Sequence, residues 1–227
     1  MRESPQVSFC FVNDASSDGT FALLVGMQRR HPGSVRLLDL PSQMGKAEAV
    51  RRGILYATAE GSPPSEFIGF WDADLATPLD EVHFLYAVAR NTPDCAMVLG
   101  SRIRRLGSTI HRKAARHYLG RVFATFASLT LRLPVYDTQC GAKLVRTTLV
   151  HPLFDEPFVS RWIFDVELLA RLRNLVGAEV LLASTVEAPL NTWRDVGGSK
   201  LTLRHMLRTP LDLWRIARRY NQASRVG

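Results

Sequence analysis

Residues 66–78 read E-F-I-G-F-W-D-A-D-L-A-T-P, a short apolar run followed at once by two acids. The run Phe67–Trp71 predicts a strand inside a sheet that is covered on both faces. Side chains alternate along extended backbone, so Asp72 and Asp74 are expected to point the same way. Two adjacent carboxylates repel each other unless a cation lies between them, and hard oxygen ligands suit Mg²⁺ or Mn²⁺, with diphosphate oxygens completing the shell. Alternatively, Asp72 caps the strand and Asp74 caps a helix that begins near Thr77-Pro78.

Short apolar runs and helical patterns alternate on both sides of this strand. Strands alternating with helices of this length predict an α/β fold with a mainly parallel sheet. After Gly100 the chain becomes basic, and the expected helix His111–Arg132 ends in the apolar stretch Val122–Leu131, so it either lies in a membrane interface or packs on the sheet. The other expected strands are Val7–Asn13, Val35–Leu38, Cys95–Leu99 and Val180–Pro189, and the other expected helices are one ending near Arg30, Met44–Ala59, Leu79–Arg90, Phe164–Leu175 and Leu201–Tyr220.

Composition and charge limit the classes of protein to consider. The 227 residues are 46% hydrophobic and 22% charged, which are ordinary values for a globular protein of one domain. Most of the 29 basic residues behind the net charge of +8 are arginines, whose forks suit phosphate on a nucleotide, a lipid or a membrane surface. Three widely spaced cysteines argue against a disulfide framework or a structural zinc site and fit a reducing cytoplasm. No signal peptide is visible, and the longest uncharged apolar run is too short to span a bilayer.

Two further places carry groups that a nucleotide would need. Asp14 follows the expected first strand, beyond whose carboxyl end a parallel sheet presents ligands; it either accepts hydrogen bonds from a base or a ribose or closes a turn. Gly45-Lys46 at a helix start offers backbone N–H groups and a cation to a phosphate. The residues around it do not form a Walker loop, and no G-x-G-x-x-G follows a strand, which argues against P-loop and dehydrogenase functions.

Seven motifs follow one another along the chain: V-N-D-A-S-S-D-G-T, G-K-A-E-A-V-R-R-G, D-A-D-L-A-T-P, G-S-R, D-T-Q-C-G-A-K-L, R-W-I-F-D-V-E-L-L and G-G-S-K-L. In this order and spacing they resemble glycosyltransferase family 2, and within it the dolichyl-phosphate β-glucosyltransferase and polyprenyl-phosphate glycosyltransferase branch. The resemblance runs from about Val7 to Tyr220. It implies a single GT-A domain over residues 1–227, with a nucleotide-sugar half to about residue 100 and an acceptor half, from about residue 101, that ends in amphipathic helices.

The resemblance also implies a reaction. The expected reaction is inverting, metal-dependent transfer of a hexose, best matched by glucose from UDP-glucose, to a polyprenyl or dolichyl phosphate. Mg²⁺ or Mn²⁺ is the implied cofactor, and the implied location is peripheral, at the cytoplasmic face of a membrane whose surface is a partner. Nucleic-acid binding is not expected, because the basic residues are spread along the chain and no recognition motif accompanies them.

The functional residues that the resemblance implies fall into three groups. The first would bind the nucleotide sugar and its metal: Asp14, Gly45, Lys46, Asp72 and Asp74, of which Asp72 and Asp74 would hold the Mg²⁺ or Mn²⁺. The second would bind the phosphate groups and the acceptor: Arg102, Arg112, Arg116, Lys143 and Lys200. The third is the acid near the reacting centre, Asp165, with Glu167 as its substitute.

The charge of the acceptor shapes the expected mechanism. A phosphate monoester is already anionic at neutral pH, so it needs less help from a general base than a sugar hydroxyl does. The demanding tasks are to bring two anions together and to stabilise the departing UDP, and a divalent ion with an Arg/Lys cluster suits both. Asp165 is therefore expected to be an orienting acid or a weak base, although Asp165 and Glu167 also suit a helix start.

The beginning of the chain departs from the family pattern. Relatives usually have a strand and a proline-plus-Asn-Glu turn ahead of the strand expected here at Val7–Asn13, whereas only Met1–Gln6 precede it. Without that strand, Val7–Asn13 and Phe67–Trp71 are expected to face a gap with unpaired backbone, unless the sheet closes differently. A catalytically weak nucleotide-sugar or lipid-phosphate binding protein is therefore the competing interpretation. Ala15 stands where the family usually has Gly and is expected to tighten its turn.

Overall fold

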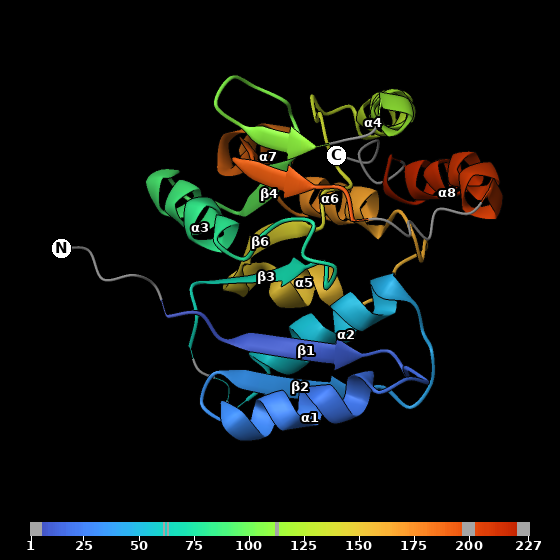
Figure 1. The fold of residues 1–227 in the computed structure, drawn as a ribbon. Coiled ribbons are helices and arrows are strands. Elements are labelled where there is room, and N and C mark those ends of the chain that lie inside the picture. The colour runs from blue at the N-terminus through green and yellow to red at the C-terminus, as the bar shows by residue number, and fades with distance from the viewer. Residues whose placement is uncertain (1–5, 61, 63, 112–113, 197–202, 222–227) are drawn as a thin grey trace.

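The computed structural model describes residues 6–60, 62, 64–111, 114–196 and 203–221, with the side chains of 111, 114–119, 203–207 and 221 left out. The predicted α/β class is confirmed, and Figure 1 shows helices on both sides of the strands. Within the described residues, the pair β1 and β2 lies at the bottom of the view, and the strands β3, β6 and β4 lie above it. The strands are β1 (Phe9–Asn13), β2 (Val35–Asp39), β3 (Phe67–Trp71), β4 (Met97–Ser101), β5 (Thr109–His111), β6 (Ala142–Arg146), β7 (Thr185–Pro189) and β8 (Thr192–Arg194).

The helices connect and cover these strands. Helix α2 packs against both β1 and β3, and α3 packs against β4, β6 and β7. Helices α4 and α8 contact each other and both contact α6. The helices are α1 (Thr20–Arg30), α2 (Lys46–Thr58), α3 (Glu81–Asn91), α4 (Ala114–Leu131), α5 (Val150–Phe154), α6 (Phe164–Val176), α7 (Ala178–Ser184) and α8 (Leu203–Asn221), and a 3-10 turn spans Thr147–Leu149.

Among the described strands most pairs are parallel, but antiparallel pairs are present too. Strands β1 and β2 pair in parallel, as do β4 with β7 and β5 with β8, but β6 runs antiparallel to both β3 and β4. In the four-stranded sheet the order is β3-β6-β4-β7. Strand β6 belongs to the second half of the chain and lies between two strands of the first half, so the two predicted halves share one sheet.

The main core lies between this sheet and α6. All five residues of β4 are buried, and α6 is buried without interruption from Phe164 to Arg173. The ring of Phe164 lies 5.5 Å from that of Phe70 on β3. Burial of such large apolar side chains supplies most of the stabilisation of a domain of this size, so β3 and the acids that follow it stand on a rigid support.

Strand β1 and strand β3 do not pair with each other. Within the described residues, β1 pairs with β2 and β3 pairs with β6, and no strand lies between β1 and β3. The N–H of Phe9 donates to the Ser34 carbonyl of the β2 side. Because successive residues of a strand form hydrogen bonds in opposite directions, Cys10 and Val12 direct their backbone N–H and C=O groups away from β2, toward β3.

The facing edge of β3 is open in the same way. The Asp72 N–H donates to the Gly141 carbonyl on the β6 side, at 2.8 Å. By the same alternation, Phe67, Gly69 and Trp71 direct their backbone groups away from β6, toward β1. Helix α2 crosses this opening closely, since a Cβ atom on Gly53 would lie 2.6 Å from the Val12 side chain. The expected gap with unpaired backbone is therefore present, and the sheet does not close differently in the described part of the chain.

Two segments differ from the sequence expectation. Residues 180–184, expected as the start of a strand, belong to helix α7, and the strand begins at Thr185. Gly177, with φ of 82°, separates α6 from α7 and lets the chain start a new helix. Strand β6 was not anticipated, because A-K-L-V-R carries two charges in five residues and acquires its strand character from pairing with β3 and β4.

Candidate active site

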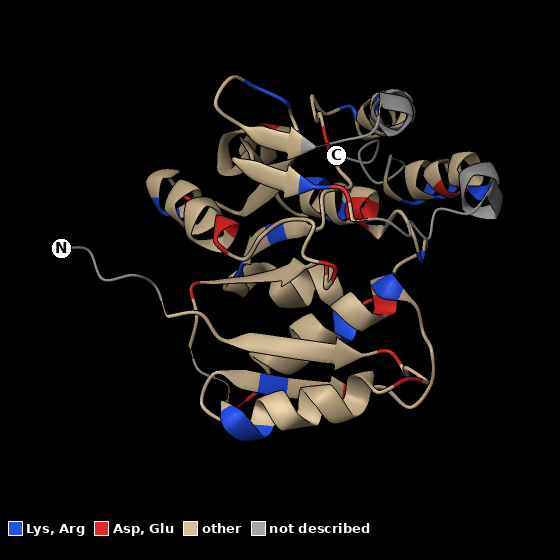
Figure 2. Ribbon diagram, in the orientation of Figure 1, with Lys and Arg blue, Asp and Glu red and all other residues tan. Residues whose placement is uncertain are grey.

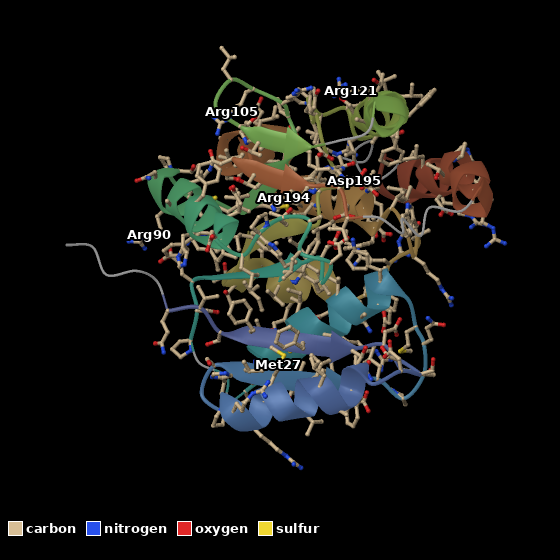
Figure 3. All side chains as sticks on the ribbon, in the orientation of Figure 1. Met27, Arg90, Arg105, Arg121, Arg194 and Asp195 are labelled. Atoms are coloured by element: carbon tan, nitrogen blue, oxygen red, sulfur yellow. The ribbon has the colours of Figure 1, made fainter. Side chains whose placement is uncertain are left out.

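One large cleft collects most of the predicted site residues. Its volume is 2610 Å³, and β1, β3 and the turns at their carboxyl ends line it. Figure 2 shows acidic segments at these ends of β1 and β3, on the side where α2 begins. Figure 3 labels Met27, Arg121 and Asp195, three cleft residues that come from α1, from α4 and from the segment after β8. The predicted site residues that line the cleft are Asp14, Gly45, Lys46, Asp72, Asp74 and Arg102.

Asp72 and Asp74 stand on a turn rather than on extended backbone. The strand ends at Trp71, and the Leu75 N–H donates to the Asp72 carbonyl, with Leu75 at φ of 52°. Strand alternation therefore does not explain why both acids reach the cleft; the turn does. Asp74 accepts the Ala76 N–H at 3.0 Å, and because α3 begins later, at Glu81, Asp74 is not a helix cap.

Lys46 interacts electrostatically with the carboxylates of the site. Its ammonium lies 2.6 Å from Asp72 Oδ1. Burial lowers the pKa of Lys46, but the carboxylates of Asp165, Asp72 and Asp74 outweigh burial and raise this pKa above its usual value. A site that already attracts an ammonium to two cleft carboxylates has the charge and oxygen ligands that a divalent cation needs. Among the described residues no cluster of three or more His, Cys, Asp or Glu side chains is present, so a bound nucleotide would have to supply further ligands.

Gly141 makes room for the Asp72 carboxylate. A Cβ atom at position 141 would lie 2.0 Å from Asp72 Cγ and Oδ2. The Asp72 side chain therefore packs directly on the Gly141 backbone, whose carbonyl also accepts the Asp72 N–H. Glycine is the residue that permits this approach, which gives the G of D-T-Q-C-G-A-K-L a role in shaping the site.

Asp14 is held by the start of α2. Its carboxylate accepts the Met44 N–H at 2.6 Å and the Gly45 N–H at 2.9 Å. The Gly45 N–H, which was expected to hold a phosphate, thus donates to a protein carboxylate in this structure. Asp14 here has the second of its two predicted roles, that of closing a turn. Gly45 has φ of 89° and Ala15 has φ of 51°, so both stand in the left-handed region that favours glycine.

Asp165 and Lys143 form a buried pair behind the cleft. The Lys143 ammonium donates to Asp165 Oδ1 and to the Cys140 carbonyl, and its side chain is 0% exposed. Neither residue is among the described residues that line the cleft. Lys143 also lies 5.2 Å from the centre of the Phe70 ring. The Lys143–Asp165 ion pair is thus enclosed in the protein behind the cleft.

Glu167, the substitute acid, is part of a separate network. It accepts hydrogen bonds from Arg171 at 2.8 Å and from the Tyr220 hydroxyl at 2.8 Å. Arg171 donates further to backbone carbonyls, including that of Leu153. This network ties α8 to α6 and to the end of α5, so Glu167 has a structural role.

Arg102 is held in position by acidic residues that the sequence analysis did not select. Asp137 accepts from Arg102 Nε at 2.6 Å and from Nη2 at 2.7 Å. Burial disfavours the charged guanidinium, yet Asp137 raises the pKa of Arg102 further above its usual value. Glu187 on β7 in turn accepts the N–H groups of Tyr136, at 2.8 Å, and Asp137, at 2.6 Å. Asp137 therefore fixes the orientation of the Arg102 guanidinium, and Glu187 fixes the backbone of Asp137. The Nη1 group of Arg102 takes no part in the contact with Asp137.

Several further cleft residues were missed. Arg161 lines the cleft, and its side chain comes within 3.9 Å of a Cβ built on Gly45. Asp137 and Gly141 both belong to the quoted motif D-T-Q-C-G-A-K-L, from which Lys143 alone was chosen, so the motif was the available signal. The predicted residues Arg112 and Lys200 lie outside the described residues, as does the side chain of Arg116.

The described helices carry exposed apolar side chains near the cleft. Helix α4 buries Ala124, Ala127 and Leu131 and contacts α6 and α8, so this face of the helix packs on the protein. Its other face exposes Val122, Phe126 and Leu129, and α8 exposes Leu211 and Trp214. No helix in the described part of the chain is long and apolar enough to cross a membrane.

Comparison with known proteins places this chain in a family. The sequence profile of Glycosyl transferase family 2 matches residues 2–154, and the chain therefore belongs to that family. More particularly, it is similar to dolichyl-phosphate beta-glucosyltransferases: it is 33% identical to one from Trichomonas vaginalis over 95% of this chain and 61% of the relative. It is also 33% identical to one from Drosophila melanogaster, over 84% of this chain and 56% of the relative. The chain thus spans about three fifths of the length of the curated relatives it matches.

Solved structures confirm the predicted GT-A fold. The protein resembles glucosyl-3-phosphoglycerate synthase from Mycobacterium tuberculosis in complex with phosphoglyceric acid, with a TM-score of 0.65 and 16% identity over 92% of this chain and 69% of that one. The same enzyme in complex with Mn²⁺, UDP and glucosyl-3-phosphoglycerate matches with a TM-score of 0.61 and 16% identity, over 92% of this chain and 67% of that one. At this identity the likeness concerns the fold.

Proposed function

We propose that the protein transfers a hexose, glucose from UDP-glucose in the first instance, to a polyprenyl or dolichyl phosphate with inversion at the sugar carbon. The observation that carries the proposal is that two acids and two cations, Asp72, Asp74, Lys46 and Arg102, line one cleft. Such a cleft suits a reaction that brings two anions together. The similarity to dolichyl-phosphate beta-glucosyltransferases supports the choice of sugar and acceptor.

The donor is proposed to bind at the β1 and β3 ends. Asp14 shapes the turn at the start of α2, beside which the nucleotide would lie. Asp72 and Asp74 would hold Mg²⁺ or Mn²⁺, which when bound neutralises the diphosphate and stabilises the departing UDP. Lys46, which bonds Asp72 in the structure, would turn to the diphosphate oxygens.

The acceptor phosphate is proposed to bind near Arg102. The bidentate contact with Asp137 uses Nε and Nη2 of Arg102, so Nη1 remains to hold a phosphate oxygen. Asp165 is proposed to orient Lys46 and the neighbouring acids through its charge rather than to remove a proton. The same acceptor site would also use Arg112, Arg116 and Lys200, with Lys143 supporting it from behind.

A peripheral place on the cytoplasmic face of a membrane is proposed on the evidence of α4 and α8. Their exposed side chains Val122, Phe126 and Trp214 also line the cleft. Apolar side chains beside basic ones are typical of helices that lie in a membrane interface. In a co-sedimentation assay the protein should bind vesicles with anionic lipids, and a Phe126→Ser/Trp214→Ser double variant should bind them less. A protein that remains unbound at every anionic lipid content would contradict this location.

Transfer of radiolabelled sugar to a short polyprenyl phosphate tests the function. A panel of UDP-glucose, UDP-galactose, UDP-N-acetylglucosamine and GDP-mannose identifies the donor, and each donor is tried with and without EDTA. We expect transfer from UDP-glucose that EDTA abolishes and that Asp72→Asn abolishes too. Transfer that persists in EDTA would refute the metal dependence, and no transfer from any donor would refute the enzyme.

A catalytically weak binding protein is the second candidate. The open edges of β1 and β3 favour it, because a cleft with unpaired backbone along its walls holds a nucleotide less rigidly than a closed sheet does. This candidate predicts that UDP-glucose binds in calorimetry while no sugar is transferred. Measurable turnover by the chain with this sequence excludes it.

A further inference from the structure

Two polar atoms in the turn before β6 are buried without a hydrogen-bond partner. They are the Thr138 hydroxyl oxygen and the Gln139 side-chain nitrogen, and neither has a partner within the described part of the chain. Thr138 is 1% exposed, so bulk water does not satisfy its hydroxyl. Buried polar groups are normally hydrogen-bonded, and an unpaired one lowers stability. Both residues line the cleft, which suggests that a ligand supplies the missing partners.

The position of these two residues along the chain places them between the charged groups of the site. Asp137, immediately before them, holds the Arg102 guanidinium. Gly141, two residues after Gln139, lies against the Asp72 carboxylate. Thr138 and Gln139 therefore lie between the acid that faces the proposed diphosphate and the arginine that faces the proposed acceptor phosphate.

The turn is held in place before any ligand binds. Glu187 accepts the N–H groups of Tyr136 and Asp137, and Asp137 Oδ1 accepts the Gln139 N–H at 3.2 Å. The backbone of Thr138 and Gln139 is thus fixed by contacts that involve neither of their side chains. Groups that are fixed in this way lose little conformational freedom when they bind.

We propose that Thr138 and Gln139 hydrogen-bond hydroxyl groups of the sugar that the donor carries, and so help to select it. The proposal rests on the function proposed above. In a transfer between a diphosphate and a phosphate, the sugar must lie between the two anions, where these two residues are. A hydroxyl and an amide are neutral and match sugar hydroxyls, whereas phosphate oxygens are matched by the Lys46 and Arg102 side chains. A site built to bond a hydroxyl discriminates strongly against a sugar that lacks it or presents it elsewhere.

Thr185 offers a matched control. Its hydroxyl oxygen is also buried without a partner in the described structure, but it begins β7 and is not among the described residues that line the cleft. Thr138→Val and Thr185→Val remove the same group from the same residue type. Both should leave the melting temperature unchanged or raise it, because each removes an unpaired buried hydroxyl.

The two variants should differ in their use of the donor. For Thr138→Val we expect kcat/KM with UDP-glucose to fall about tenfold, the effect of one lost hydrogen bond, while the dissociation constant of UDP stays within twofold. Gln139→Met should behave likewise, and Thr185→Val should match the original protein. With a series of deoxy-glucose donors, one deoxygenation should impair the original protein and cause no further loss in Thr138→Val.

Several outcomes would overturn the proposal. One is an unchanged kcat/KM in both Thr138→Val and Gln139→Met. Another is a loss of UDP affinity as large as the loss of kcat/KM, since the residues would then act on the nucleotide or on the fold. If the original protein transfers no sugar, the proposed function fails, but calorimetry still tests the subsite. The two variants should then weaken UDP-glucose binding and not UDP binding, and equal weakening of both would again reject the proposal.

Discussion

Replacing Gly141 with alanine should push the Asp72 carboxylate out of its position in the cleft. The new Cβ atom would lie 2.0 Å from Asp72 Oδ2, whereas ordinary van der Waals contact begins at 3.4 Å. The carboxylate must therefore move by about 1.4 Å to relieve the overlap. The backbone offers little escape, because the Asp72 N–H is bonded to the Gly141 carbonyl at 2.8 Å and the strands β3 and β6 continue from this point.

The size of the effect follows from that displacement. A misplacement of about 1 Å in an active site can cost about 100-fold in rate, and overpacking costs about 1–3 kcal/mol of stability. We therefore expect Gly141→Ala to lower kcat/KM for UDP-glucose about 100-fold and to weaken binding of UDP in the presence of Mn²⁺. Isothermal titration calorimetry measures the binding, and chemical denaturation measures the stability.

Two further variants separate the site from the fold. Gly26→Ala in α1 places a Cβ where no atom lies within 4 Å, so nucleotide binding should not change. In an Asp72→Ala background the overlapping carboxylate is absent, and Gly141→Ala should then cost little additional stability. Should Gly141→Ala retain Mn²⁺-dependent UDP binding and turnover within twofold, the idea that Asp72 must lie against this glycine would be refuted.

Three other expectations concern local features of the fold. Ala15→Gly should raise the free energy of unfolding by up to about 1 kcal/mol, because Ala15 is left-handed; a decrease on chemical denaturation would contradict this. The amides of Cys10 and Val12 should exchange with deuterium faster than those of β1 that face β2, and equal protection would show that the edge is covered. Hydrogen bonds from Arg51 hold the pKa of Glu48 at about 2, and because solvent screens this surface group, Glu48→Gln should cost about 1 kcal/mol at pH 7. That cost should disappear as the pH falls from about 4.5 toward 2, since the unfolded carboxyl titrates first, and a difference that persists at pH 2 would refute the assignment.

Elements defined by consecutive residues were predicted well. The strand Phe67–Trp71 has the predicted bounds, and α1, α2 and α6 end within a few residues of their expected positions. An apolar run and a helical period are local properties, so tertiary contacts seldom override them in long elements. The strand predicted over residues 180–184 was wrong, because V-L-L-A-S suits either a strand or a buried helix. Gly177, with its positive φ, allows a new helix to begin directly after α6.

The site was predicted in its residue types more than in its contacts. Asp72, Asp74 and Lys46 line one cleft, but Lys143 was expected beside a ligand and is enclosed with Asp165. The pairing of Arg102 with Asp137 joins residues 35 positions apart. Nothing in the local pattern around either residue announces such a partner.

The amino-acid order was sufficient for the α/β alternation, the family and the acids that follow the aromatic strand, because each is written in neighbouring residues. Folding was needed to bring Gly141 under Asp72, to enclose Lys143 with Asp165, and to leave β1 and β3 facing each other across an open cleft. The first two features depend on β6, which inserts between β3 and β4 from the second half of the chain. Strand pairing between distant segments is governed by burial and backbone hydrogen bonding, and neither is visible in a local pattern.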